Sequence, residues 1–283
     1  MFGLTEKGWD SSSRSAQAVD YKRRTREQWG TNPCGAHAAG GLEAGTREYF
    51  DAIEDYRYNV DSPWLKEAVG FNGFQNKRLL EIGFGTGTDL LQFARAGALV
   101  TGVDLTPRSI DIARRRFDVY GQRGEFLIGD GEHLSFPDES FDVVYSFGVL
   151  HHTPDTVRAI KEIHRVLRPR GKAIVMLYHR GSLFYWGGLI FKHGILKGKL
   201  LRHSVAEIMS RHVEYGAAES RPLVKAYTRD EARRLFCDFG EAEISVNQLT
   251  RRELRPFGRI LPEPVFTRLA KGFGWNLLIK ATR

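Results

Sequence analysis

The chain has 283 residues, of which 42% are hydrophobic and 27% are charged, a balance typical of a globular protein with one full core and additional segments. Its formal net charge of +8 favours an anionic partner without identifying one, since a phosphorylated or carboxylated small molecule, nucleic acid and an anionic membrane surface all fit. The two cysteines, Cys34 and Cys237, do not indicate a disulfide framework, and no Cys/His spacing suggests a zinc site.

Residues 1–59 are predicted to form a polar N-terminal arm. The first residues lack the apolar region of a secretory signal, so we expect a cytoplasmic protein. Residues 21–30 and 46–58 have helical patterns, and Tyr56, Arg57 and Tyr58 come just before the core. We expect this arm to close over a bound ligand as a lid, although its aromatic side chains also suit ordinary packing on an amphipathic helix.

A glycine-rich turn is the most informative element of the chain. A short apolar strand from residue 78 ends in Glu81, three alternating glycines follow at Gly83, Gly85 and Gly87, and a helical pattern begins after them. Glycine at these positions lets a ligand approach bare backbone, while the helix N-terminus presents free N–H groups. The turn alone is a weak signal, because many α/β proteins carry one.

Two acidic side chains follow at the ends of the next predicted strands. The run 98–104 reads as a strand that ends in Asp104, close to the roughly 20-residue offset at which Rossmann-like folds place a ribose-binding acid. Thr106 and the proline after it look like the cap of the next helix, which leaves Asp104 available for a ligand. A third strand begins at residue 126 and leads to Asp130, and a fourth covers 141–146.

The remaining segments alternate in the same way. A helix is predicted after Pro154 to about Leu167, and a fifth strand at 172–179. A capping box at 228–231 opens another helix, and strands are expected at 243–249 and 275–281. We therefore divide the chain into an arm (1–59), a ligand-binding core (60–180), an insertion (181–226) and a part that returns to the core sheet (227–283).

With these four motifs in this order, residues 77–180 resemble the class I S-adenosylmethionine-dependent methyltransferases, in the branch of the ubiquinone/menaquinone C-methyltransferases and many small-molecule enzymes. The resemblance implies an α/β, Rossmann-like, doubly wound seven-stranded sheet with a reversed last strand. It also implies S-adenosylmethionine as cofactor, S-adenosylhomocysteine as product, and transfer of a methyl group to O, N, C or S of a small-molecule acceptor. No metal is implied.

The resemblance assigns cofactor contacts residue by residue. Glu81 and the glycines would cradle the methionine part, Asp104 would accept from the ribose hydroxyls, and Asp130 would bind the adenine amino group. The full predicted set is Glu81, Gly83, Gly85, Thr86, Gly87, Asp104, Leu105, Asp130, Gly131, Glu132, Ser146 and Phe147.

Four side chains are candidates for the acceptor side. Ligands in open α/β sheets bind at the carboxyl ends of the strands, which places His151, His152, Tyr178 and His179 near the acceptor. Histidine is the natural base near neutral pH. For His152 the alternative is a role in fixing the loop before the next helix.

Other functions are less well supported. A dinucleotide fingerprint wants a small residue where Thr88 stands, and nothing else indicates hydride chemistry. The basic charge would suit an RNA-modifying enzyme, but we see no appended RNA-binding module. The apolar and basic stretch 183–201, too short to span a bilayer, suits peripheral membrane contact and a quinone or lipid acceptor. The acceptor and the oligomeric state stay open, as does the difference between an enzyme and a cofactor-binding protein.

Overall fold

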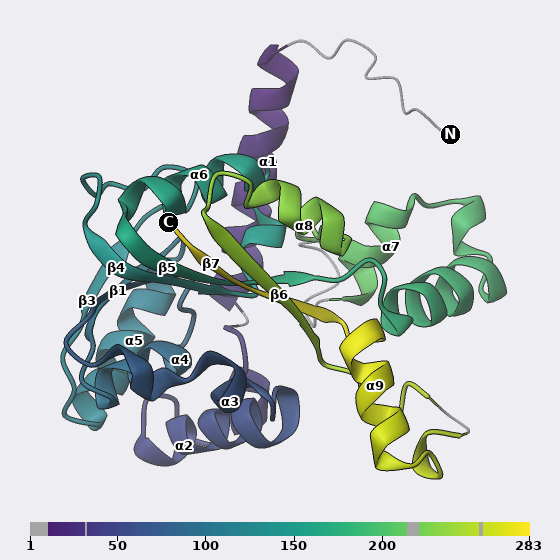
Figure 1. Cartoon of the computed structure of the whole chain (residues 1–283), viewed down its shortest axis with the longest axis horizontal. Coiled ribbons are helices and arrows are strands. Elements are labelled where there is room, and N and C mark those ends of the chain that lie inside the picture. The colour runs from purple at the N-terminus through teal and green to yellow at the C-terminus, as the bar shows by residue number, and fades with distance from the viewer. Residues whose placement is uncertain (1–10, 32, 214–220, 255–256) are drawn as a thin grey trace.

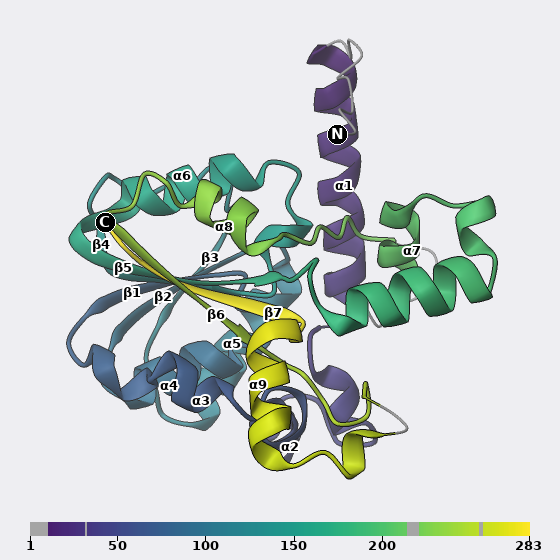
Figure 2. The same cartoon turned by 45° about the vertical axis from the view of Figure 1, so that its right-hand side comes forward.

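The computed structural model describes residues 11–31, 33–213, 221–254 and 257–283. Residues 1–10 and 32 of the predicted arm, and 214–220 of the predicted insertion, lie outside this set. The architecture is one twisted seven-stranded sheet with helices on both faces, which is clearest in Figure 2. The predicted fold class is confirmed.

The strand order is β3-β2-β1-β4-β5-β7-β6. The first five strands pair in parallel, and β7 pairs antiparallel with both β5 and β6. The order reverses between β1 and β4, the point where open α/β sheets bind ligands at the carboxyl edge. The strands are β1 (Arg78–Ile82), β2 (Leu99–Asp104), β3 (Glu125–Ile128), β4 (Phe141–Phe147), β5 (Leu167–Tyr178), β6 (Glu241–Asn247) and β7 (Asn276–Thr282).

Helices cover the two faces of the sheet around two apolar clusters (Figures 1 and 2). One face carries α6 (Thr156–Val166) and α8 (Arg229–Leu235), and the other carries α2 (Arg47–Asp55), α3 (Leu65–Val69), α4 (Thr88–Arg95) and α5 (Pro107–Val119). Both predicted caps are present, since the side chains of Thr106 and Thr228 accept from backbone N–H groups at the start of α5 and α8.

Further elements lie outside these two layers. The long helix α1 (Ser11–Thr31) stands beside the sheet, and the insertion projects from the end of β5 as η5 (Phe184–Leu196) and α7 (Val205–His212) (Figure 2). The helix α9 (Glu263–Phe273) precedes β7. Short helical turns are η1 (Ala36–Ala39), η2 (Tyr56–Asp61), η3 (Phe71–Phe74), η4 (Leu150–His152), η6 (Lys199–Leu201) and η7 (Phe257–Arg259).

The largest differences from the predicted element boundaries occur in three places. The helix expected at 21–30 extends to Ser11, and the one expected at 46–58 ends at Asp55, where the wider turn η2 begins. The run 168–171 was expected to separate a helix from a strand. Instead β5 starts at Leu167 and includes residues 168–171. Its register against β4 shifts there, and Arg170 has a φ of +65°.

No helix among the residues that the structure describes combines the length and the apolarity needed to cross a membrane.

Candidate functional site

The three glycines of the turn after β1 have different surroundings. All have positive φ, at +75° for Gly83, +54° for Gly85 and +70° for Gly87. A Cβ on Gly83 would lie 2.3 Å from Cγ2 of Val149, and one on Gly87 would lie 3.2 Å from Cβ of Ala113. A Cβ on Gly85 would meet no atom within 4 Å. Gly85 therefore faces open space, while the other two permit close packing.

Asp104, at the end of β2, is tied to the same turn. Its Oδ2 accepts from the backbone N–H of Gly85 at 3.0 Å, and its Oδ1 accepts from both the N–H and the hydroxyl of Thr106 at 2.9 Å. Burial raises the pKa of Asp104, and the hydrogen bonds from Thr106 and Gly85 oppose that rise. Because each carboxylate oxygen has two acceptor positions, Oδ2 keeps capacity for one further donor.

Glu81, at the end of β1, holds a buried acceptor. Its Oε2 has no hydrogen-bond partner among the described residues, and the side chain is 4% exposed. Burial raises the pKa of Glu81 well above its usual value, and the nearby Asp89 carboxylate adds to the rise. The buried Oε2 of Glu81 and the open space at Gly85 would suit a ligand with an amino acid group. Its cationic ammonium would donate the hydrogen bond that Oε2 lacks.

Replacing Glu81 by Gln is expected to change the pH dependence of stability. The pKa of Glu81 is higher in the folded protein than in the unfolded chain. The folded protein therefore has its full stability below the unfolded-state pKa, where the carboxyl is neutral in both states. Stability is lost as pH rises from the unfolded-state pKa to the folded-state pKa. The free energy of unfolding of Glu81→Gln should therefore exceed that of the wild type by a margin that grows as pH rises above about 5, past the usual glutamate pKa. Urea unfolding across this range measures the difference, and parallel curves would contradict the assignment.

Asp130, which is predicted to bind the adenine amino group, and its neighbour Glu132 both pair with a lysine of the N-terminal helix. Lys22 of α1 places its Nζ 2.5 Å from Oδ2 of Asp130 and also donates to Glu132. Glu132 further accepts from the hydroxyl of Thr153 and from the N–H of Asp155 at 2.7 Å. Burial lowers the pKa of Lys22, but the bonds to the two carboxylates outweigh it and the pKa is raised. The N-terminal helix thus contacts Asp130 and Glu132, and the role of the arm as a lid stays a prediction.

Carboxylate oxygens of Asp130 and Glu132 also lie within 4.8 Å of a ring nitrogen of His133. The Lys22 ammonium already binds both acids there, so the group does not indicate a metal.

A buried polar network lies next to the glycine turn. Asp89, in the first turn of α4, accepts from Arg57 at 2.7 Å, from the hydroxyl of Tyr58 at 2.7 Å and from that of Tyr145 at 2.8 Å. Burial alone would raise the pKa of Asp89, but the Arg57 guanidinium lowers it. The guanidinium also lies 4.2 Å from the ring centroid of Phe147. The sequence analysis identified Arg57 and Tyr58 as candidates but missed Asp89. An acid in the first turn of the helix that follows the glycine turn could have indicated it.

The other predicted cofactor residues have mostly structural contacts. The hydroxyl of Ser146 donates to the Ile82 carbonyl at 3.0 Å and is fully buried, while the hydroxyls of Thr86 and Thr88 lie 3.0 Å apart. A Cβ on Gly131 would lie 3.0 Å from Ile82. Leu105 is half-buried between Asp104 and the cap of α5.

Three of the four acceptor-side candidates lie together at the ends of β4 and β5. The ring of His151 stacks on Tyr178 at 3.7 Å between centroids, and the His152 ring lies 4.3 Å from that of His151. Both ring nitrogens of His151 are buried without a hydrogen-bond partner among the described residues. Burial lowers the pKa of His151 well below its usual value, with His152 and Lys225 adding to the effect.

The other histidines have backbone partners. Nδ1 of His152 lies 2.6 Å from the Leu223 carbonyl, and its ring lies 5.8 Å from that of Trp29 in α1. Nδ1 of His179 lies 2.9 Å from the Gly274 carbonyl. His179 thus tethers the segment before β7, which sequence reasoning did not anticipate.

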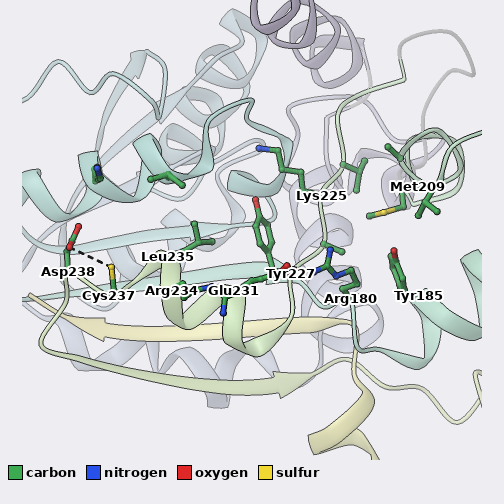
Figure 3. Close-up of a pocket in the computed structure, with 16 residues that line it drawn as sticks. Arg180, Tyr185, Met209, Lys225, Tyr227, Glu231, Arg234, Leu235, Cys237 and Asp238 are labelled. Carbon is green, nitrogen blue, oxygen red and sulfur yellow. Dashed lines mark hydrogen bonds and ion pairs between the residues drawn. The ribbon is translucent and has the colours of Figure 1, made fainter. Parts of the chain in front are cut away.

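A cavity of about 670 Å³ lies between α6, α8 and the insertion (Figure 3). Its wall includes Tyr185, Met209, Lys225 and Tyr227, and none of the glycines of the turn lines it. The backbone N–H of Lys225 donates to the His151 carbonyl at 2.9 Å. Lys225 therefore connects the wall of the cavity to the backbone of the histidine pair.

Parts of this chain are similar in sequence to known proteins. Residues 80–175 match a family model described as a methyltransferase domain. Phthiotriol/phenolphthiotriol dimycocerosates methyltransferase of Mycobacterium leprae is 42% identical over 151 residues, which cover 52% of this chain and 54% of that protein. Sterol 4-C-methyltransferase of Caenorhabditis elegans is 37% identical over 103 residues (36% and 31%), and demethylmenaquinone methyltransferase of Tropheryma whipplei is 34% identical over 116 residues (41% and 48%). The matches thus span about a third to a half of these relatives.

Solved structures share the fold at low sequence identity. An S-adenosylmethionine-dependent methyltransferase of Methanosarcina mazei aligns with a TM-score of 0.54 and 21% identity, covering 76% of this chain and 96% of that one. The (4+2)-cyclase SpnF aligns with a TM-score of 0.54 and 17% identity, covering 95% and 94%. Because a cyclase shares the fold, the reaction has to be argued from the site.

Proposed function

We propose that this chain, which carries the methyltransferase domain and is a homologue of S-adenosylmethionine-dependent methyltransferases, transfers a methyl group from S-adenosylmethionine to a small molecule. The observation that supports this most is the group of Glu81, Gly85 and Asp104 at the point where the strand order reverses. A cationic amino acid group suits the buried acceptor of Glu81, and a ribose hydroxyl suits the remaining acceptor position of Asp104.

The cofactor, when bound, would supply an electrophilic methyl on a sulfonium. Glu81 and the backbone at Gly83 and Gly85 would hold its methionine part, and Asp104 its ribose. Asp130, with the backbone at Gly131 and Glu132, would hold the adenine. These contacts would hold the methyl group in line with an acceptor, and the main task of the protein would then be to position that acceptor.

We place the acceptor next to His151, His152 and Tyr178. The lowered pKa keeps the His151 imidazole neutral at physiological pH, the form that accepts a proton from an acceptor. Tyr178 packs against the apolar cluster of the insertion, which includes Tyr185 and Leu189, so the insertion would form one wall of this pocket. Such a base is needed only when the acceptor atom carries a proton that does not dissociate by itself near neutral pH.

The relatives point to an apolar acceptor. Their names describe methylation of a sterol, a demethylmenaquinone and a phthiotriol. A quinone or lipid held at a membrane is therefore the second candidate, beside a freely diffusing small molecule.

Calorimetric titration with S-adenosylmethionine and S-adenosylhomocysteine, with NAD as control, tests the cofactor assignment. We expect micromolar binding of both sulfur compounds and none of NAD. Transfer of a labelled methyl group to quinone, sterol and polyketide acceptors then tests the reaction. Binding of NAD alone would overturn the proposal, while cofactor binding without transfer to any acceptor would favour a non-catalytic protein.

Replacement of Lys22 by Met is expected to tighten cofactor binding severalfold, because its ammonium binds the carboxylate proposed for the adenine amino group. The same titration in Lys22→Met measures the change. Arg24→Met is a matched control, since Arg24 belongs to the same helix and forms an ion pair with Asp20, away from the two acids. Weaker binding in Lys22→Met would instead show that Lys22 helps to hold the cofactor.

A further inference from the structure

The insertion after β5 exposes an apolar surface, which we call the η5 face. It consists of six large side chains within residues 186–201: Trp186, Phe191, Ile195, Leu196, Leu200 and Leu201. Leu196 is 68% exposed and Leu201 is 89% exposed. Single exposed apolar residues are ordinary on a soluble protein, but six in one short segment indicate an interaction surface.

The geometry of η5 separates this face from the part that holds the insertion together. η5 is a wide helix with i→i+5 hydrogen bonding, so Trp186, Phe191 and Leu196 follow one another along one side. Tyr185 and Leu189 point the other way, into a cluster with α7. The insertion therefore has its own packed interior, and the η5 face is not needed to complete it.

The charged side chains within the segment that carries the η5 face have one sign. Lys192, Lys197 and Arg202 are exposed beside the apolar side chains, and Lys199 is half-buried. No aspartate or glutamate occurs between residues 184 and 201, and the first acid after them is Glu207. Apolar side chains flanked in the sequence by cations suit a partner that has an apolar interior and a negatively charged surface.

We propose that the η5 face docks the protein on an anionic lipid bilayer. Its aromatic and aliphatic side chains enter the interface between headgroups and acyl chains, while Lys192, Lys197 and Arg202 remain at the level of the phosphates. A second copy of the chain is a poorer occupant, because the same cations would face each other across a two-fold interface. This inference rests on exposure and charge and does not depend on methyl transfer.

Cosedimentation of the full chain with phosphatidylcholine vesicles, with and without phosphatidylglycerol, tests the proposal. We expect binding to the vesicles with phosphatidylglycerol, weakened by salt, and little binding to phosphatidylcholine alone. Lys197→Glu with Arg202→Glu should lower the partition coefficient at least about tenfold. Leu196→Ser with Leu201→Ser should lower it by a similar factor, because both side chains lose their apolar contact with the interface.

Two matched variants control for changes in overall charge and apolarity. Arg108→Glu with Arg114→Glu reverses two exposed cations on α5, and Val60→Ser with Leu99→Ser removes two side chains that are 63% and 62% exposed elsewhere. Both should bind vesicles almost as the wild type does. No binding of the wild type at low salt would overturn the proposal, as would equal losses in the controls.

Sedimentation velocity without lipid tests whether a second copy of the chain, rather than a bilayer, covers the η5 face. If the wild type is a dimer that dissociates in Leu196→Ser with Leu201→Ser, a second copy covers the η5 face and the proposal is wrong. A monomer in both proteins, together with loss of vesicle binding, supports the bilayer.

Discussion

Asp104→Ala is expected to lower the affinity for S-adenosylhomocysteine at least about 100-fold, the equivalent of about 3 kcal/mol. The carboxylate is the proposed acceptor for a ribose hydroxyl, and it also holds the turn through the N–H of Gly85. Truncation removes the ligand contact and releases the backbone that the ligand contacts. Isothermal titration calorimetry at a temperature where the variant is folded measures the loss.

The same substitution also affects the protein without ligand. Three donors, the N–H of Gly85 and the N–H and hydroxyl of Thr106, lose a buried acceptor, so we expect destabilisation of about 2 kcal/mol in urea unfolding. Asp111→Ala is the matched control, because Asp111 is exposed on α5 and should change neither quantity. Unchanged affinity in a folded Asp104→Ala protein would remove Asp104 from the cofactor site.

Alanine at Gly83 and alanine at Gly85 are expected to have opposite consequences, although both replace a glycine of the same turn. At Gly83 the new Cβ would lie 2.3 Å from Val149 Cγ2 with φ at +75°, so overpacking and backbone strain together should destabilise the fold by about 3 kcal/mol. At Gly85 the Cβ enters open space at φ +54°, and the expected cost to stability is about 1 kcal/mol.

Ligand binding should follow the reverse order for this pair. The Cβ at Gly85 occupies the space proposed for the cofactor, so Gly85→Ala should lose affinity at least about tenfold while its melting temperature stays near that of the wild type. Gly83→Ala should lose mainly thermal stability. Thermal unfolding and calorimetry on both variants test this, and equal binding by Gly85→Ala and the wild type would show that the open space is not the cofactor site.

Much of the fold could be predicted from the chain because its signals are local. Period-two and period-3.6 patterns, the glycine turn, the caps at Thr106 and Thr228 and the acid at the end of β2 depend on neighbours within a few residues. These signals predicted the individual strands and the acids at their ends, and the resemblance to a known family implied how the strands form one sheet and where the cofactor would bind. The boundaries were less predictable, since the bulge at 168–171 depends on pairing between β5 and β4.

What the sequence determined by itself is the set of groups at the strand ends, because strand ends follow from short-range patterns, whereas the order of the strands was implied only by the resemblance to a known family. Tertiary structure alone decided which groups meet. Lys22 reaches Asp130 across 108 positions, Asp89 gathers Arg57 and Tyr145, and η5 turns its apolar side outward. Such contacts depend on how whole elements pack, and burial then sets the charge that each group carries.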